Sequence, residues 1–339
     1  MESFNIGLIG AGAIANAHLF AYSQNPLIKE IALADVNEEA LARMKANYPK
    51  VRKTFTDYRR MLEDEAIQII DICLPHYLHH RVTIDSLSAG KDVICEKPIA
   101  ITLEEADDMI ETARRLGKRL FISMNQRFMP YHKEAKKLID EGKIGKPFLA
   151  VFNIMGNAFN EMNAPDHWKG SWDKAGGGAL FDTGYHAIYM MLYFLGKPKA
   201  VIASTKRLLV KPDNKADDNS VAILEFEDAL GTIAVSYTIF SEGWSEKRYI
   251  YGTEGSLHIQ DEIEDNLVLF KNGQPQRIDV NHPKDIHPHP YSVKCALDHF
   301  IDCVVKDKEP EVKAEEARET LAVALAIYRS AREGKKVYL

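Results

Sequence analysis

Short apolar runs alternate with amphipathic segments through the first third of the chain. Apolar runs that are separated by helical patterns are typical of a parallel sheet with helices on both faces. The predicted strands lie at 4–9, 31–34, 69–74, 93–95 and 120–124. The predicted helices lie at 13–23, 38–47, 78–88 and from a capping box at Thr102 to Leu116. This part of the chain therefore predicts a doubly wound α/β domain.

The pattern changes after Met124. A helix is expected at 131–141, and the apolar runs that follow it are separated by short turn signals instead of helices. Strands in this order favour an antiparallel sheet. They are expected at 148–155, 200–210, 220–226, 231–237, 249–251, 256–259 and 267–270, with closing helices at 291–305 and 314–332. We therefore expect two domains, residues 1–123 and 124–339.

Composition and charge narrow the class of protein. With 339 residues, of which 46% are hydrophobic and 27% charged, the chain has the balance of a soluble protein. Its net charge of -6 and lack of a basic stretch argue against nucleic-acid binding. No apolar run is long enough to span a bilayer, and no secretory signal precedes the first strand. We therefore expect no membrane partner. None of the four cysteines forms a C-x-x-C pair, and Cys73 and Cys95 lie inside apolar runs, so we expect small buried side chains in a reducing compartment, the cytoplasm.

The first predicted strand ends in the sequence Gly10-Ala11-Gly12-Ala13-Ile14-Ala15, a G-x-G-x-x-A turn that opens a helix. Such a turn lets the backbone approach a pyrophosphate, and the helix N-terminus offers N–H groups to it. Asp35 ends the second strand, where a carboxylate accepts hydrogen bonds from a ribose diol and repels a 2′-phosphate. This predicts NAD and disfavours NADP. The alternative is a structural glycine turn without a ligand.

A lysine stands at the end of the fourth strand, in Cys95-Glu96-Lys97-Pro98. Ligands of open parallel sheets bind outside the carboxyl ends of the strands, so Lys97 could donate to a substrate oxygen there. The alternative is an ordinary surface lysine.

A triple glycine, Gly176 to Gly178, leads into ALFDTGYH and a strongly apolar segment that predicts a buried helix. Asp182 and His186 are four residues apart, which would place them on one face of that helix. A buried carboxylate and imidazole are costly unless they are paired or functional. Histidine is a natural general base near neutral pH, and a nearby carboxylate can orient it. The alternative is a mutually satisfied pair in the core.

Four segments together resemble the Gfo/Idh/MocA oxidoreductase family: the GAGAIA turn, Glu96-Lys97-Pro98, Asn125-Gln126-Arg127-Phe128 and GGGALFDTGYHAIYMMLYFLG. The resemblance implies a Rossmann domain and an α/β domain with a large open, mostly antiparallel sheet. It implies NAD(P)-dependent chemistry on sugars, cyclitols or related polyols, carried by Lys97, Asp182 and His186. It also implies a cis Lys97–Pro98 bond and a homodimer or homotetramer built through the open sheet.

The resemblance extends to the binding residues. The loop from Leu74 to His79 is similar to a cofactor loop of the family, from which Leu74 and His76 depart. The expected cofactor contacts are Gly10, Gly12, Ala13, Ile14, Asp35, Leu74, Pro75, His76, His79, Glu96, Lys97, Asn125 and Arg127. The expected substrate contacts are Lys97, Asn157, His167, Trp168, Asp182, Tyr185 and His186. The aromatic segment around Trp168 suits a sugar, and its alternative is an ordinary ordered loop.

The segment HPKDIHPHP holds His282, His287 and His289, but its prolines favour a rigid loop, and we predict no metal site.

The predicted function is an NAD-dependent dehydrogenase of a sugar or polyol. One alternative is a glycoside hydrolase that uses NAD for a transient oxidation, and another is a dinucleotide sensor without redox activity.

Overall fold

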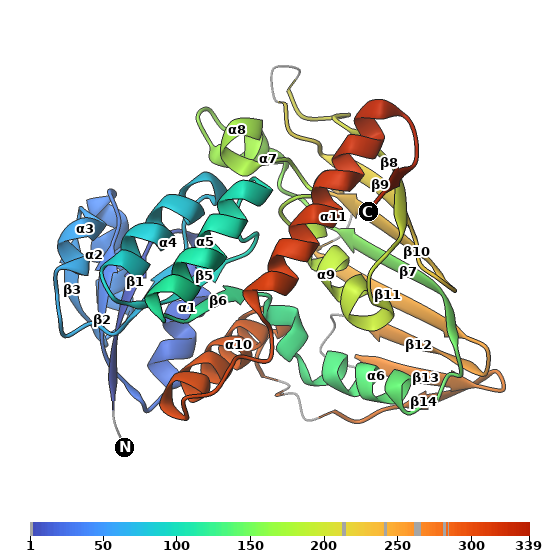
Figure 1. Ribbon diagram of the computed structural model, residues 1–339, viewed down its shortest axis with the longest axis horizontal. Helices are drawn as coiled ribbons and strands as arrows, with labels where there is room; N and C mark the ends of the chain where they lie inside the picture. The colour runs from blue at the N-terminus through green and yellow to red at the C-terminus, as the bar shows by residue number, and fades with distance from the viewer. Residues whose placement is uncertain (1–2, 212–214, 241–242, 261–265, 281–282, 284) are drawn as a thin grey trace. The chain divides into compact units, whose positions relative to one another are not determined.

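The computed structural model describes residues 3–211, 215–240, 243–260, 266–280, 283 and 285–339. These residues form two compact units, which Figure 1 shows as separate sheets with their helices. The first unit comprises Met1–Asn125 and His289–Arg318, and the second comprises Gln126–Pro288 and Glu319–Leu339. The chain thus returns to its first unit near the C-terminus, while the expected domains 1–123 and 124–339 stay a prediction.

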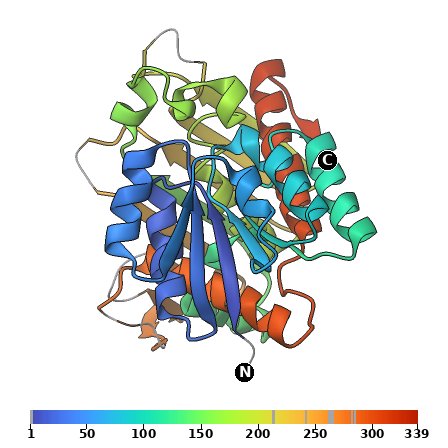
Figure 2. The same cartoon turned by 90° about the vertical axis from the view of Figure 1, so that its left-hand side faces the viewer.

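The first unit is built on a six-stranded parallel sheet in the order β3-β2-β1-β4-β5-β6. The chain order reverses between β1 and β4, which is where ligands of such sheets bind. Helices lie on both faces of the sheet (Figure 2), as the alternation of apolar and amphipathic segments predicts. The strands are β1 (Phe4–Ile9), β2 (Ile28–Ala34), β3 (Val51–Phe55), β4 (Ile69–Ile72), β5 (Asp92–Glu96) and β6 (Leu120–Ser123).

Helix α5 (Leu103–Leu116) begins and ends where its cap residues predict. The Thr102 hydroxyl accepts the N–H of Glu105, the Glu105 carboxylate accepts the N–H of Ile101, and Gly117 ends the helix with φ 62°. The helices of this unit are α1 (Ala13–Gln24), α2 (Glu38–Asn47), α3 (Tyr58–Leu62), η1 (His76–Leu78), α4 (His79–Ser88), α5 (Leu103–Leu116) and most of α10 (Pro288–Val305).

Two elements of the first unit have no counterpart in the predicted pattern, β3 and α3. β3 is the edge strand, and its sequence VRKTF is exposed at its three central positions. An exposed edge strand carries neither the apolar run of a buried strand nor a regular alternation, so its pattern gave no strand signal.

The second unit is built on a mixed, mostly antiparallel sheet, as expected. In the described residues its order is β14-β13-β12-β11-β7-β10-β9-β8-β15, and only β7 and β10 among the named pairs are parallel. The strands are β7 (Pro147–Met155), β8 (Ala200–Lys206), β9 (Asn219–Glu225), β10 (Leu230–Ser236), β11 (Ser245–Gly252), β12 (Gly255–Gln260), β13 (Leu267–Lys271), β14 (Gln274–Arg277) and β15 (Val337–Tyr338).

Helices cover one face of this sheet (Figure 1). Helix α9 packs on β7 and β10, α6 packs on β12, and Ser330 of α11 accepts the N–H of Ala203 in β8. The helical segments of this unit are η2 (Asn125–Phe128), α6 (Pro130–Asp140), α7 (Phe159–Asn163), η3 (Trp168–Gly170), α8 (Trp172–Ala175), α9 (Gly184–Leu195) and most of α11 (Ala314–Glu333). Within the described ranges, no helix is both long and apolar enough to cross a membrane.

Two local expectations need correction, and a third residue cannot be compared. Helix α9 begins only at Gly184, so Asp182 lies in the turn before the helix and not on a helix face with His186. Helix α10 begins at Pro288, because proline is tolerated in a first helical turn, so His289 is helical and not part of a loop. His282 lies outside the described residues.

Candidate active site

The glycine turn of the first unit has the shape that a dinucleotide requires. Gly10 has φ +105°, and a Cβ there would lie 2.2 Å from the carbonyl oxygen of Cys73, so a larger residue cannot be accommodated. A Cβ at Gly12 would meet no atom within 4 Å, which leaves open space beside the backbone. Gly12 is also the N-cap of α1 and has no side chain to bind the first-turn N–H groups. The turn therefore fits a pyrophosphate.

Asp35 lies directly beside this turn. Its Oδ2 accepts the N–H of Ala11 at 2.7 Å, and its Oδ1 accepts the N–H of Asn37 at 2.8 Å. The carboxylate is only partly buried. A ribose diol can approach it from solvent, next to the place where the pyrophosphate would lie, as the identification of NAD requires.

The Lys97–Pro98 peptide bond at the end of β5 is cis, as the family resemblance implied. The preceding residue, Glu96, is 7% exposed. Its Oε2 accepts the N–H of Lys97 at 3.2 Å, and its Oε1 lies 3.0 Å from Nε2 of His18. The carboxylate of Glu96, an expected cofactor contact, is thus held by groups of the protein.

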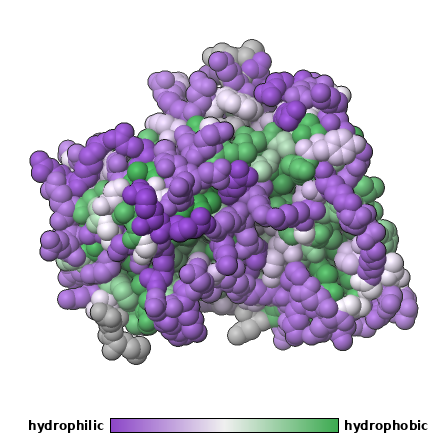
Figure 3. Space-filling view, viewed as in Figure 1, coloured by the Kyte–Doolittle hydropathy of each residue, from purple (hydrophilic) through white to green (hydrophobic). Residues whose placement is uncertain are grey.

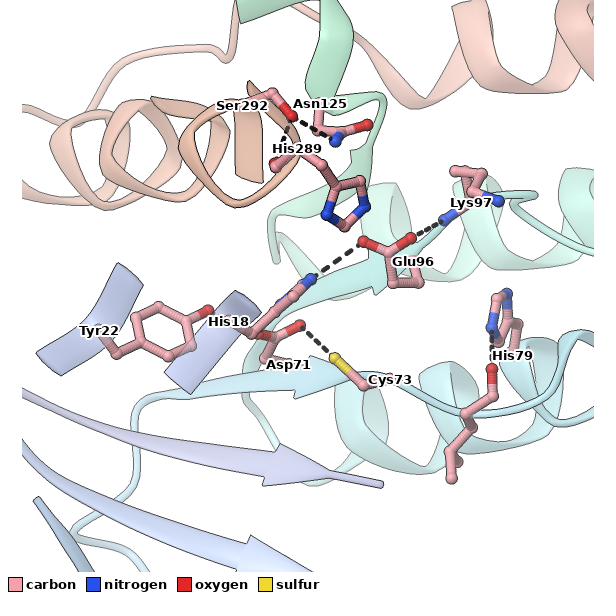
Figure 4. A network of polar contacts seen from close by, with 11 residues as sticks. His18, Tyr22, Asp71, Cys73, His79, Glu96, Lys97, Asn125, His289 and Ser292 are labelled. Carbon is pink, nitrogen blue, oxygen red and sulfur yellow. Dashed lines mark hydrogen bonds and ion pairs between the residues drawn. The ribbon is translucent and has the colours of Figure 1, made fainter. Parts of the chain in front are cut away.

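His18 connects Glu96 to the interior of the first unit (Figure 4). Its Nδ1 lies 2.6 Å from Oδ2 of Asp71, which also accepts the hydroxyl of Tyr22 at 2.7 Å. Burial opposes charge on the imidazole, but the Asp71 carboxylate raises the pKa of His18 well above 6.5. Burial likewise opposes charge on Glu96, and the hydrogen bond from His18 lowers the pKa of Glu96. The three groups form a buried carboxylate–imidazolium–carboxylate network.

The same region contains donor atoms that could in principle bind a metal. Potential ligand atoms of His18, Asp71 and Cys73 lie within 4.8 Å of one another. However, both nitrogens of His18 already contact carboxylates, and burial raises the pKa of the Cys73 thiol to about 12. A metal ligand must be deprotonated, so the group fits a hydrogen-bonded network better than a metal centre.

Two buried histidines make contacts within the expected cofactor loop, which runs from Leu74 to His79. His79 has its Nε2 2.8 Å from the carbonyl oxygen of Leu74 and its Nδ1 2.7 Å from that of Pro98, and burial lowers the pKa of its imidazole. The ring of His76 lies edge-on to that of His79, with centroids 5.7 Å apart, and is 3% exposed. His79 thus joins the Leu74 loop to the segment that follows Lys97.

Asn125 and Arg127, the last expected cofactor contacts, fall in different units. Asn125 donates to the hydroxyl of Ser292 at 2.8 Å, and that hydroxyl donates to the carbonyl of His289 (Figure 4). The guanidinium carbon of Arg127 lies 3.9 Å from the centre of the Tyr193 ring in the second unit.

In the second unit, Asp182 is held by two donors. Lys169 places its Nζ 2.8 Å from Oδ2 of Asp182, and the Tyr237 hydroxyl donates to the same oxygen at 2.6 Å. Burial opposes charge on Lys169, but Asp182 raises the pKa of that ammonium. Asp182 is 9% exposed, so a carboxylate with a lysine counterion lies at the edge of the buried region.

His186 has a different partner. Its Nδ1 lies 2.7 Å from the hydroxyl of Tyr189, one turn further along α9, and the imidazole is also 9% exposed. Two predicted catalytic residues thus lie near the start of one helix, with an ammonium and a phenol beside Asp182 and another phenol beside His186.

The triple glycine has a steric reason. A Cβ at Gly178 would lie 1.9 Å from the backbone oxygen of Asp217, so only glycine fits there. The Asp217 carboxylate accepts the N–H groups of Gly178 and Leu180 and the hydroxyls of Tyr328 and Ser220. This buried carboxylate fixes the segment that leads into Asp182.

The other expected substrate contacts differ in their exposure and in their partners. The His167 ring stacks on Trp168 with centroids 6.1 Å apart, and its Nδ1 accepts the N–H of Lys169. Asn157 is exposed and its Oδ1 accepts the N–H of Phe159. Tyr185 is 0% exposed and packs on the rings of Phe181 and Tyr189, so we do not retain it as a substrate contact.

Sequence reasoning missed Lys169, Tyr237 and Tyr189. Lys169 follows Trp168 in a segment that was already interpreted as a substrate region, so its charge could have been noticed. Tyr237 follows β10, far along the chain from Asp182, and no local pattern connects the two. Tyr189 lies within the apolar run of a helix that was predicted to be buried, so it was interpreted as a packing residue.

Comparison with known proteins now identifies the class of this chain. Residues 4–124 match the family described as "Oxidoreductase family, NAD-binding Rossmann fold", and residues 136–339 match "Oxidoreductase family, C-terminal alpha/beta domain". The chain belongs to the Gfo/Idh/MocA oxidoreductase family. NAD is therefore the cofactor of its Rossmann unit.

Among relatives of this Gfo/Idh/MocA protein, levoglucosan dehydrogenase of Pseudarthrobacter phenanthrenivorans is 28% identical, covering 86% of this chain and 82% of its own. Myo-inositol 2-dehydrogenase of Thermotoga maritima is 26% identical, covering 98% of each chain. The solved structure of the WlbA dehydrogenase from Bordetella pertussis, in complex with NADH and UDP-GlcNAcA, is 26% identical with a TM-score of 0.86, covering 100% and 99%.

Proposed function

We propose that this oxidoreductase exchanges a hydride between NAD and a secondary alcohol or ketone of a sugar, cyclitol or related polyol. The observation that carries the proposal is the polar cluster of the second unit, in which Asp182 is bound by Lys169 and Tyr237 and His186 by Tyr189. Ionisable groups at the boundary between core and solvent mark a site where protein contacts can be exchanged for substrate contacts.

The first unit holds the residues that would bind NAD. The backbone at Gly12 and the start of α1 would bind the pyrophosphate, and Asp35 would bind the adenosine ribose. When bound, the nicotinamide supplies a hydride acceptor or donor at one ring carbon.

We assign three roles to the protein. His186 removes the hydroxyl proton of the alcohol as hydride leaves the same carbon, because imidazole is an effective base near neutral pH. Lys97 donates a hydrogen bond to the developing alkoxide and stabilises its charge. Asp182 orients His186 and favours the imidazolium that forms there, and Lys169 and Tyr237 hold the Asp182 carboxylate in place.

A polyol substrate fits the residues on the Asp182 side of the second unit. His167 and Trp168 present stacked rings, which suit the C–H faces of a sugar, and nearby polar groups suit its hydroxyls. The relatives named above act on levoglucosan and myo-inositol by their names, which supports the same class here.

The test is NADH formation, followed by absorbance, across a panel of aldoses, inositols and anhydro-sugars with NAD and NADP in parallel. We expect at least one panel member to be oxidised with NAD. His186→Ala should then lower turnover by about 10²- to 10⁴-fold, the usual contribution of a general base, with nearly unchanged NAD affinity. Wild-type turnover in His186→Ala would refute the role of His186.

The panel also separates the alternatives. A glycoside hydrolase that uses NAD transiently would cleave a glycoside without net NADH, and a sensor would bind NAD without any turnover. Preference for NADP would contradict the role of Asp35.

We further propose that the open face of the large sheet forms a homodimer or homotetramer contact. This face exposes apolar side chains of neighbouring strands, including Ile202 of β8, Val221 and Ile223 of β9 and Leu230 of β10. Figure 3 shows green apolar surface interspersed with purple polar surface on the half of the molecule that carries this sheet. Exposed apolar side chains on three neighbouring strands support burial against a second copy. In sedimentation velocity, Val221→Asp should shift the protein towards monomer and Val305→Asp should not; two identical profiles would refute this contact.

A further inference from the structure

Tyr189 is a buried hydrogen-bonding residue in contact with the predicted base. It is 1% exposed, and its hydroxyl lies 2.7 Å from Nδ1 of His186. The same hydroxyl oxygen accepts the backbone N–H of Gln126 at 3.2 Å. The rings of Tyr189 and His186 also pack edge to face with centroids 5.5 Å apart. The phenol therefore fixes both the position and the plane of the imidazole.

The group behind Tyr189 is itself firmly held. The Gln126 side chain donates to Glu246 at 2.8 and 3.0 Å and accepts Nη2 of Arg248 at 2.5 Å. The Gln126 carbonyl lies 2.7 Å from Nδ1 of His132. Burial lowers the pKa of His132 well below 6.5, so His132 is neutral and its Nδ1–H donates to that carbonyl. The backbone amide that faces Tyr189 is thus anchored by three buried or half-buried side chains.

The direction of these hydrogen bonds bears on the chemistry. A backbone N–H can only donate, so the Tyr189 oxygen is an acceptor towards Gln126. A phenol oxygen with two lone pairs can accept a second hydrogen bond, from Nδ1–H of His186, and the phenol O–H is then left to donate to a different acceptor. That arrangement leaves Nε2 of the neutral imidazole without a proton, and Nδ1–H persists when Nε2 becomes protonated. The opposite arrangement, with the phenol donating to Nδ1, would put the proton on Nε2 and block it as a base.

We propose that Tyr189 is a positioning residue that keeps the proton of neutral His186 on Nδ1 and so leaves Nε2 to accept the substrate proton. This rests on the proposed function for its catalytic meaning, since His186 is the base only there. The hydrogen bond itself is a property of the protein without substrate. Because the same oxygen accepts Nδ1–H before and after proton uptake, the imidazole does not need to rotate during turnover.

The first test is Tyr189→Phe, which removes only the hydroxyl. We expect kcat to fall roughly 3- to 10-fold, the size of one neutral hydrogen bond, with little change in the KM for NAD. The acidic limb of the profile of kcat/KM against pH should move to lower pH, because the imidazolium loses an acceptor. The matched control is Tyr193→Phe, the same change on the same helix, where the ring over Arg127 is retained. Identical rates and pH profiles in the two variants would overturn the proposal.

A second test does not depend on activity or on the stability of a variant. In the full-length protein without substrate, imidazole ¹⁵N NMR distinguishes the protonated nitrogen of His186 from the other one, with assignment by comparison with His186→Ala. We expect protonated Nδ1 and unprotonated Nε2 in the neutral ring. A proton on Nε2 would overturn the role of Tyr189 whether or not a sugar is oxidised, whereas failure of the substrate panel would count only against the proposed function.

Discussion

The two units each contain a cluster of ionisable groups, and the clusters differ in what surrounds them. In the first unit, the side chains of His18 and Asp71 are both 0% exposed, and the network closes on itself through Glu96. In the second unit, Lys169 and Asp182 have side chains that are 27% and 13% exposed. Charges that face only one another stabilise a scaffold, while charges at the edge of the core can exchange partners with a ligand.

The buried network of the first unit nevertheless contacts a predicted catalytic residue, Lys97, through Glu96. Glu96 receives His18 on one carboxylate oxygen and the N–H of Lys97 on the other. The buried cluster thus fixes the backbone from which the predicted catalytic lysine extends. We therefore expect substitutions in the first cluster to change stability most, and substitutions in the second to change activity most.

The largest effect on stability should come from His18→Leu. This change leaves the carboxylates of Asp71 and Glu96 without their cation, and breaking a buried ion pair costs about 3–5 kcal/mol. Urea unfolding near neutral pH measures the loss. His80→Leu is the matched control, because His80 pairs with Asp108 at a half-exposed site and should cost about 1 kcal/mol or less. An equal loss of unfolding free energy in both variants would mean that the buried network contributes no more to stability than a half-exposed pair.

A smaller effect, on activity instead of stability, should come from Lys169→Met. Loss of a charged hydrogen bond to Asp182 should lower kcat/KM roughly 10- to 100-fold, while the free energy of unfolding changes by about 1 kcal/mol or less because both groups are partly solvated. Steady-state kinetics and urea unfolding test the two parts. Lys146→Met removes an exposed lysine from Asp228 and should leave activity unchanged. If Lys169→Met destabilised the fold without slowing turnover, Lys169 would belong with the scaffold.

The smallest effect concerns pH. The pKa of His18 is raised in the folded state, so its contribution is fully present below about 6.5 and is lost as pH rises through the folded pKa. The pKa of Glu96 is lowered, so its contribution is present above about 4.5 and is lost as pH falls through the folded pKa. The stability difference between wild type and His18→Leu should therefore be greatest between these limits and shrink on both sides.

Urea unfolding of both proteins across this pH range measures that difference, with a slope of at most about 1.4 kcal/mol per pH unit for one proton. A difference that grows as pH rises towards 6.5 and stays level above it would show that His18 is buried in its neutral form.

The predicted features that the structure confirms share a local cause. The strands β1 and β4 are buried apolar runs, the start of α5 is set by Thr102 and Glu105, and the turn at Gly10 follows from a strand that ends in glycine. Each depends on residues within a few positions of one another. The edge strand β3 was not predicted, because an exposed strand carries no apolar pattern.

The sequence by itself determined the alternation that makes a Rossmann unit, the change to a mostly antiparallel sheet, and the presence of Gly10, Asp35, Lys97, Asp182 and His186 in their motifs. Only the tertiary structure decided their partners. It joined His18 to Asp71 and Glu96, Lys169 and Tyr237 to Asp182, and Tyr189 to both His186 and Gln126. The physical reason is range: strand and helix patterns are set by neighbouring residues, whereas a hydrogen bond between distant segments exists only once the packed sheets have brought its two ends within about 3 Å.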